Sequence, residues 1–187
     1  MSEPVSALPG ARYAGLVKVA EAGLRGMIVL RGDLASKAVA KAVKDATGMP
    51  VPETRRIAFG KEAAVAWMAP DELLILTDHA AVAKTVAKLE KALAGEFATV
   101  ADVSDARAVF TLTGAQARDV LAKACPVDFA DFPVGSIRRT RAAQVAAAIW
   151  RTEEDAFTLV CFRSVARYMW DLLTTLARPG GEVGLYR

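Results

Sequence analysis

The sequence predicts an α+β protein in which antiparallel sheets pack against helices. Three observations indicate this class: short apolar strands alternate with helical stretches, paired apolar runs flank polar turns, and the whole pattern occurs twice. The chain has 187 residues, of which 53% are apolar and 24% charged, as is typical of globular proteins. We therefore expect one domain, 1–187, built of two repeats at about 26–95 and 97–178, with short N- and C-terminal extensions.

The first repeat opens with a strand followed by a helix. In GMIVLRGDLASKAVAKAV an apolar run ends at a glycine, after which apolar residues recur every three to four positions. This change of period predicts a strand and then a helix. The next stretch, AVAWMAPDELLIL, has apolar runs on both sides of Pro70–Asp71 and predicts a β-hairpin, because proline and aspartate favour turns.

A second helix is predicted to close the first repeat. Its apolar positions, which recur at helical spacing, are Val82, Val86, Leu89 and Leu93. We expect the side chain of Asp78 to cap this helix, since a short carboxylate can accept hydrogen bonds from unpaired backbone N–H groups. The stretch from Glu96 to Ser104 then leads into the second repeat.

The second repeat has the same order of elements. AVFTLTGAQARDVLAKACPVDF predicts a strand and a helix, VAAAIWRTEEDAFTLV predicts a hairpin that turns at 153–155, and FRSVARYMWDLLTTLA predicts a final helix. Each repeat therefore reads β-α-β-β-α. This is the order of a split βαβ unit, so we expect two ferredoxin-like halves.

Composition and charge exclude several classes of function. The net charge of +3 comes from 24 basic and 21 acidic residues that are dispersed along the chain, which argues against a nucleic-acid partner. No apolar run approaches the length of a membrane span, so we expect no membrane association. The N-terminal residues show no basic stretch followed by an apolar one, and we therefore expect a cytoplasmic protein.

The residues that most often carry chemistry do not form a recognisable site. Cys125 follows a helix, whose C-terminal dipole disfavours a thiolate, so we interpret it as a packed scaffold residue. His79 has no nucleophile placed near it by any motif, and we expect it in an exposed first turn of a helix. Asp102 and Asp105 fit turn chemistry. Cys125 and Cys161 lack the spacing of metal ligands. We expect no catalytic, cofactor-binding or metal-binding residue in this chain.

Arginines and tyrosine are the better candidates for binding. Arg107 is a candidate contact for an anion, because a guanidinium can hold a carboxylate through two parallel hydrogen bonds. Interface hot spots are enriched in Arg, Tyr and Trp. On that ground we expect a subunit interface at Arg138, Arg139, Arg141, Tyr186 and Arg187. The alternative interpretation is that these side chains are simply solvated.

The chain resembles the gamma subunit family of bacterial heterotetrameric sarcosine oxidase. The resemblance runs from about Gly26 to Ala177 and is carried by AWMAPDELLIL, VADVSDARAVFTLTGAQARDVLAKACPVDF, FPVGSIRRTRAAQVAAAIW and FRSVARYMWDLLTTLA. It implies a fold like that of the folate-binding aminomethyltransferase (T-protein) of the glycine cleavage system. It also implies alpha, beta and delta subunits as partners, in a complex that oxidises sarcosine to glycine and hydrogen peroxide and passes the one-carbon unit to tetrahydrofolate.

The resemblance further implies that the cofactors belong to other subunits, namely FAD, FMN, NAD, zinc and tetrahydrofolate. The aminomethyltransferases carry GG-x-x-DD before the first hairpin turn, where this chain has Ala63–Met68 without a carboxylate. Their second hairpin reads G-E-x-G-[FY]-E, whereas Arg151–Phe157 lacks the glycine and the final acid. We therefore expect a noncatalytic subunit with a role in assembly and stability.

Two alternatives remain open at the level of sequence. A stand-alone folate-binding protein or transferase would bind tetrahydrofolate directly, which the missing carboxylates disfavour. An iron–sulfur assembly factor on the same scaffold would need a Lys-Gly-Cys motif, which Lys123-Ala124-Cys125 matches only in part.

Overall fold

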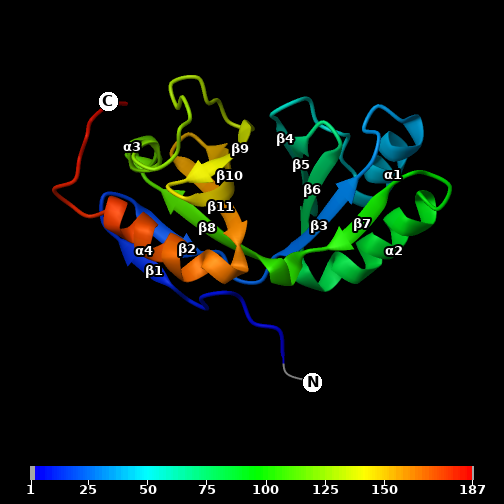
Figure 1. Ribbon diagram of the computed structural model, residues 1–187, viewed down its shortest axis with the longest axis horizontal. Helices are drawn as coiled ribbons and strands as arrows, with labels where there is room; N and C mark the ends of the chain where they lie inside the picture. The colour runs from blue at the N-terminus through cyan, green and yellow to red at the C-terminus, as the bar shows by residue number, and fades with distance from the viewer. Residues whose placement is uncertain (1–2, 187) are drawn as a thin grey trace. The chain divides into compact units, whose positions relative to one another are not determined.

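The structure, a computed structural model, describes residues 3–186, which form two compact units (Figure 1). The first unit combines the N-terminal stretch through Gly23 with the chain from Ala106 onward, and the second runs from Leu24 to Asp105. Each unit holds one antiparallel sheet with helices packed on it. The α+β class with antiparallel sheets is therefore confirmed. Between residues 3 and 186, no helix is long and apolar enough to cross a membrane.

The first unit is built on a six-stranded sheet with the order β1-β2-β8-β11-β10-β9. Its strands are β1 (Arg12–Ala14), β2 (Lys18–Glu21), β8 (Arg107–Thr113), β9 (Ile137–Ala142), β10 (Val145–Glu153) and β11 (Ala156–Phe162). The stretch expected as an N-terminal extension thus supplies two strands, and β2 pairs with β8 so that Val19 lies opposite Leu112. Both residues are at most 1% exposed, which explains why this short strand is held in the sheet.

Two helices cover one face of this sheet, α3 (Ala117–Ala122) and α4 (Ala166–Leu176) (Figure 1). Short 3₁₀ turns precede β8 and α4 at Ser104–Ala106 and Arg163–Val165. Alternate residues of the strands point toward the helices because strand side chains alternate between faces. Phe110, Phe157 and Leu159 are at most 1% exposed there and form the core with Met169 and Leu173 of α4.

The second unit is built on a five-stranded sheet with the order β4-β5-β6-β3-β7. Its elements are β3 (Gly26–Arg31), α1 (Lys37–Thr47), β4 (Ile57–Phe59), β5 (Ala63–Ala69), β6 (Glu72–Thr77), a 3₁₀ turn (His79–Ala81), α2 (Val82–Ala92) and β7 (Thr99–Asp102). Helices α1 and α2 lie on one side of the sheet (Figure 1). The hairpin expected around Pro70–Asp71 is confirmed, because β5 and β6 pair on either side of it.

The two long helices of the second unit begin differently. Ser36 caps α1, since its Oγ accepts a hydrogen bond from the N–H of Ala38 at 3.2 Å, and Gly48 ends the helix with a φ of 74°. The expected side-chain cap by Asp78 is wrong. A 3₁₀ turn precedes α2, and there the backbone carbonyl of Asp78 accepts from Ala81 at 2.9 Å while its carboxylate makes no cap hydrogen bond.

Candidate functional site

Three of the candidate binding arginines, Arg107, Arg139 and Arg141, lie on one face of the first unit's sheet. Strand β9 carries Arg139 and Arg141 on the same face, because residues two apart on a strand point the same way. Arg141 lies opposite Ala146 of β10, and Ala147, the next residue, faces the helix-covered core. Arg139 and Arg141 are exposed and therefore lie on the face opposite to α3 and α4.

Arg107 lies on this same face, three strands away from β9. It pairs with Phe162 of β11, and its guanidinium carbon lies 4.6 Å from the centre of the Phe162 ring. A guanidinium over an aromatic ring is attracted by the negative face of the π-system. Phe162 is 49% exposed, whereas Arg107 is half-buried and its Nε is shielded from solvent. Ala147 of β10 pairs with Cys161 of β11, and because these strands are antiparallel, Ala146 lies opposite Phe162.

These pairings define a surface that we call the arginine row: Arg141, Ala146, Phe162 and Arg107. Its members come from the four neighbouring strands β9, β10, β11 and β8, and they lie side by side across the sheet. A guanidinium stands at each end and an exposed aromatic ring lies between them. The exposed guanidinium of Arg141 has the geometry to bind a carboxylate through two hydrogen bonds.

Arg138 is separated from its two neighbours. It lies opposite Ile149, a core residue beneath the helices, and its guanidinium carbon is 5.2 Å from the centre of the buried Phe132 ring. It also donates a hydrogen bond to the carbonyl of Ile137. The three arginines expected as one interface cluster are therefore divided between the two faces of β9, with only Arg139 and Arg141 on the face of the arginine row.

Tyr186 contacts residues of its own unit. Its hydroxyl oxygen accepts from the N–H of Phe129 at 3.4 Å, and its ring lies edge-on to Phe129 at 6.3 Å. The C-terminal stretch is held by Asp119, which is 7% exposed and accepts hydrogen bonds from the N–H groups of Leu185 and Tyr186. Tyr186 therefore anchors this stretch to α3 through its backbone. Arg187 lies outside the described residues.

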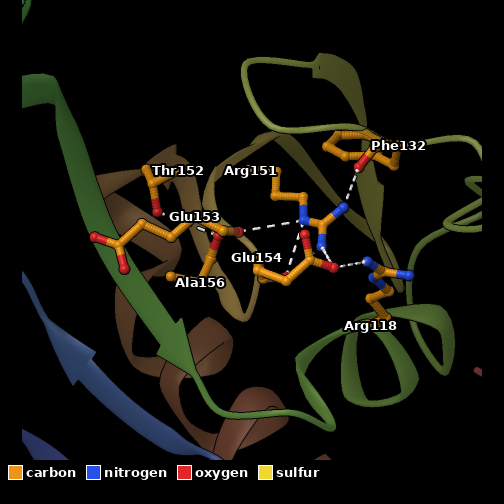
Figure 2. A network of polar contacts seen from close by, with 7 residues as sticks. All are labelled: Arg118, Phe132, Arg151, Thr152, Glu153, Glu154 and Ala156. Carbon is orange, nitrogen blue, oxygen red and sulfur yellow. Dashed lines mark hydrogen bonds and ion pairs between the residues drawn. The ribbon is translucent and has the colours of Figure 1, made fainter. Parts of the chain in front are cut away.

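A buried arginine that the sequence analysis did not single out organises the second hairpin. Arg151 is 5% exposed, and Figure 2 shows its guanidinium surrounded by backbone carbonyls and a carboxylate. It donates to the carbonyl oxygens of Phe132 at 3.0 Å, Glu153 at 3.2 Å and Glu154 at 3.0 Å. It also forms an ion pair with the Glu154 carboxylate at 2.6 Å. The signal for this role is an arginine directly after the apolar run AAAIW.

The same network includes Arg118 of α3, which contacts Glu154 at 2.8 Å (Figure 2). The side chain of Thr152 donates to the carbonyl of Ala156 at 3.1 Å and closes the turn. The turn acids are thereby engaged with residues of this unit. This network ties the hairpin to α3 and to the loop that carries Phe132, and it holds β10 and β11, two of the strands beneath the arginine row.

The remaining reactive side chains have structural surroundings. Burial raises the pKa of the Cys125 thiol from 9.0 to about 12, and Cys125 is 3% exposed, which confirms that it is a packed scaffold residue. Burial also raises the pKa of Cys161 to about 11, although the charge of Arg107 lowers it in part. The turn role expected for Asp102 is confirmed, since its carboxylate accepts from both the N–H and the hydroxyl of Ser104. His79 is half-buried in the turn before α2.

The second unit has hollows lined by charged side chains. One of about 510 Å³ is lined by Arg31, Asp71, Glu96 and Phe97 among others, and one of about 580 Å³ by Lys61, Asp78 and their neighbours. Both linings mix charges of the two signs. Over the part of the chain that the structure describes, no group of three or more His, Cys, Asp or Glu side chains could hold a metal ion.

Known proteins resemble the chain in both sequence and backbone. The family model described as the sarcosine oxidase gamma subunit family matches residues 31–178. The chain belongs to this family. The resemblance seen in the sequence is therefore confirmed. One relative is the sarcosine oxidase subunit gamma of Corynebacterium sp. (strain P-1). It is 31% identical over 151 residues, which cover 79% of this chain and 73% of the relative.

A second relative and a solved structure match over a larger share of the chain. The sarcosine oxidase subunit gamma of Arthrobacter sp. is 30% identical over 170 residues, with 88% of this chain and 82% of the relative covered. In the solved heterotetrameric sarcosine oxidase from Corynebacterium sp. U-96 in complex with pyrrole 2-carboxylate, one chain matches with a TM-score of 0.80 and 28% identity, covering 89% of this chain and 87% of that one.

The fold of this gamma-subunit family member also occurs in an enzyme of another kind. The glycine cleavage system aminomethyltransferase T from Bartonella henselae matches with a TM-score of 0.64 at 19% identity. The match covers 83% of this chain and 44% of that enzyme. At this level of identity the likeness shows the fold alone, and the expected aminomethyltransferase-like fold is confirmed.

Proposed function

We propose that this chain is the gamma subunit of a heterotetrameric sarcosine oxidase and that it serves assembly and stability of the complex. The observation that carries the proposal is the match to a chain of the solved oxidase, with a TM-score of 0.80 over 89% of this chain. Because the family model also matches residues 31–178, sequence and backbone point to the same assembly. Its partners are then the alpha, beta and delta subunits.

The side chains of this chain support a noncatalytic role in the oxidase. The two thiols are buried with raised pKa values and are therefore poor nucleophiles. The second hairpin lacks the glycine and the final acid of the aminomethyltransferase pattern, and its Glu154 is ion-paired with Arg118 and Arg151. We accordingly assign FAD, FMN, NAD, zinc and tetrahydrofolate to the other subunits. The complex converts sarcosine to glycine and hydrogen peroxide and transfers the one-carbon unit to tetrahydrofolate, in the cytoplasm.

The proposed scaffold is a duplicated one. In the second unit the order is β3-α1-β4-β5-β6-α2, and in the first it is β8-α3-β9-β10-β11-α4. The corresponding strands also take corresponding places, β4-β5-β6-β3 and β9-β10-β11-β8. These parallels support an origin by duplication of one unit, with the repeats at about 26–95 and 97–178 forming one functional domain.

The docking residues that we propose are those of the expected interface, with roles refined by their surroundings. Arg139 and Arg141 are exposed and would contact another subunit directly. Arg138 and Tyr186 would support the interface from within, since they contact Phe132 and Phe129 of this unit. Arg187 completes the expected set. Exposed arginine at an interface binds through charge-assisted hydrogen bonds, which add specificity and speed association.

The proposal is tested by co-expressing the chain with the other subunits of the oxidase from the same source and by omitting it. We expect the chain to co-elute with them on size exclusion. We also expect its omission to reduce assembly or sarcosine-dependent peroxide formation. If the chain elutes alone and its omission changes neither property, the proposal is wrong. Titration of the isolated chain with tetrahydrofolate provides the second readout, and micromolar binding would favour the folate-binding alternative.

A further inference from the structure

We infer that a hollow of the second unit binds a positively charged side chain, lysine or arginine, of another oxidase subunit. The hollow has a volume of about 510 Å³, and its lining includes Arg31, Gly32, Asp33, Asp71, Glu96 and Phe97. We call it the β7 hollow, because the loop that leads into β7 forms one of its walls. This inference rests on the proposed function and adds to it a contact of the second unit and the chemistry of the partner.

The walls of the β7 hollow meet at Gly32, directly after β3. The N–H of Gly32 donates to the carbonyl of Asp71 at 3.0 Å, which holds the turn of the β5–β6 hairpin beside the end of β3. A Cβ at Gly32 would lie 3.1 Å from the Cβ of Ala98, so the missing side chain lets the loop before β7 pack closely. The hollow is therefore built by three segments of the second unit that contact one another.

The charges of the lining favour a cation. The lining holds three carboxylates, those of Asp33, Asp71 and Glu96, and one guanidinium, that of Arg31, which leaves a net charge of −2. Arg31 is already ion-paired with Asp71 at 3.6 Å and with the buried Glu72 at 3.2 Å. An anion in the hollow would therefore meet an excess of negative charge, whereas an ammonium or a guanidinium would be attracted and could contact a carboxylate directly.

Phe97 supplies the aromatic part of the proposed site. It is fully exposed and lies in the middle of a tight turn, in which the N–H of Ala98 donates to the carbonyl of Glu96 at 2.9 Å. The face of an aromatic ring attracts a cation, and covering the ring removes apolar area from water. A basic side chain can do both, because its methylene stem packs on apolar surface while its charged end reaches a carboxylate.

Charge changes at Glu96 and removal of the Phe97 ring provide the test. The variants are Glu96→Gln, Glu96→Lys and Phe97→Ser, all at exposed positions before β7. The matched controls lie at β4, the other edge strand of the same sheet: Glu53→Lys in the loop before it and Phe59→Ser on it, both exposed. Association of each variant with the co-expressed alpha, beta and delta subunits is measured by biolayer interferometry at low and high salt, and circular dichroism verifies folding.

We expect Glu96→Lys and Phe97→Ser each to weaken Kd about tenfold, and the two controls to change it less than about twofold. Glu96→Gln should weaken Kd less than Glu96→Lys, because it removes an attraction without adding a repulsion. High salt should reduce the effect of Glu96→Lys and leave that of Phe97→Ser, since salt screens charge and not apolar contact.

The inference is wrong if folded Glu96→Lys and Phe97→Ser bind as well as their controls, and the subunit role then stands. Tighter binding by Glu96→Lys would reveal an acidic partner group and would also overturn it. Size exclusion of the isolated chain tests for a second copy as the occupant, and a dimer that Glu96→Lys disrupts would contradict the inference. If the unaltered chain does not associate with the other subunits at all, the proposed function fails and the inference fails with it.

Discussion

At the scale of single residues, burial decides what each polar side chain does in this protein. Arg139 and Arg141 are exposed, whereas Arg151 is 5% exposed and satisfied by carbonyls of its own unit. Asp119 holds the C-terminal stretch by the same principle, since a buried carboxylate must accept hydrogen bonds. Sequence alone does not separate these roles, because an arginine on a strand points to either face according to a register set elsewhere.

Replacement of Arg151 tests the structural role of the buried guanidinium. Arg151→Met keeps most of the side-chain volume but leaves the carbonyls of Phe132, Glu153 and Glu154 without this donor. We expect a loss of about 2 kcal/mol in the free energy of unfolding, measured by urea denaturation, because the buried Phe132 carbonyl loses its donor and an unsatisfied buried acceptor costs about 1–3 kcal/mol. Arg118→Met is the control. It breaks only an ion pair to a Glu154 side chain that is 77% exposed, and it should cost less than about 1 kcal/mol. Equal small losses in both variants would contradict this role.

At the scale of elements, the sequence predicted the long helices and the two central hairpins because each has a strong local signal. The β10–β11 hairpin turns at 154–155, close to the acidic residues that indicated it. Strands β4 and β9 were missed for different physical reasons. β4 has three residues, too few to show alternation, and β9 carries three arginines because it is an edge strand, where charged residues are common.

The pairing partners of other missed strands lie far away along the chain. β2 pairs with β8, so that Glu21 lies opposite Phe110, and no local pattern contains this information. The arginine row was hidden for the same reason. Its arginines were singled out one by one, but their alignment with Phe162 depends on three strand registers. A candidate site made across strands can therefore be predicted residue by residue without being recognised as one surface.

The helix starts of the second unit offer a matched pair for mutation. Ser36→Ala removes the hydroxyl that accepts from Ala38 at the start of α1, and we expect it to cost about 1 kcal/mol of the free energy of unfolding. Asp78→Ala should cost less than about 0.5 kcal/mol, because that exposed carboxylate makes no cap hydrogen bond. Thermal or urea denaturation distinguishes the two. A larger loss for Asp78→Ala would show that its carboxylate caps α2 in solution.

At the scale of the whole molecule, the chain is arranged so that the second unit is continuous and the first is assembled from both ends. The chain passes from the first unit to the second after Gly23, forms the whole second unit from Leu24 to Asp105, and re-enters the first unit at Ala106. Each unit has its own core beneath its own helices. The N-terminal strands therefore stabilise β8–β11, which follow about a hundred residues later, and not the unit next to them in sequence.

A pair of core truncations tests this division. Val19→Ala on β2 removes two methyl groups from the core of the first unit, and Val65→Ala on β5 does so in the second; both side chains are at most 1% exposed. Each should lower the free energy of unfolding by about 2 kcal/mol. Native-state hydrogen exchange should then show faster exchange in β8, β10 and β11 for Val19→Ala, and in β3, β5 and β6 for Val65→Ala, because local opening follows cooperative units. If both variants speed exchange equally in all six strands, the two units open together, and the chain behaves as a single cooperative unit despite its two cores.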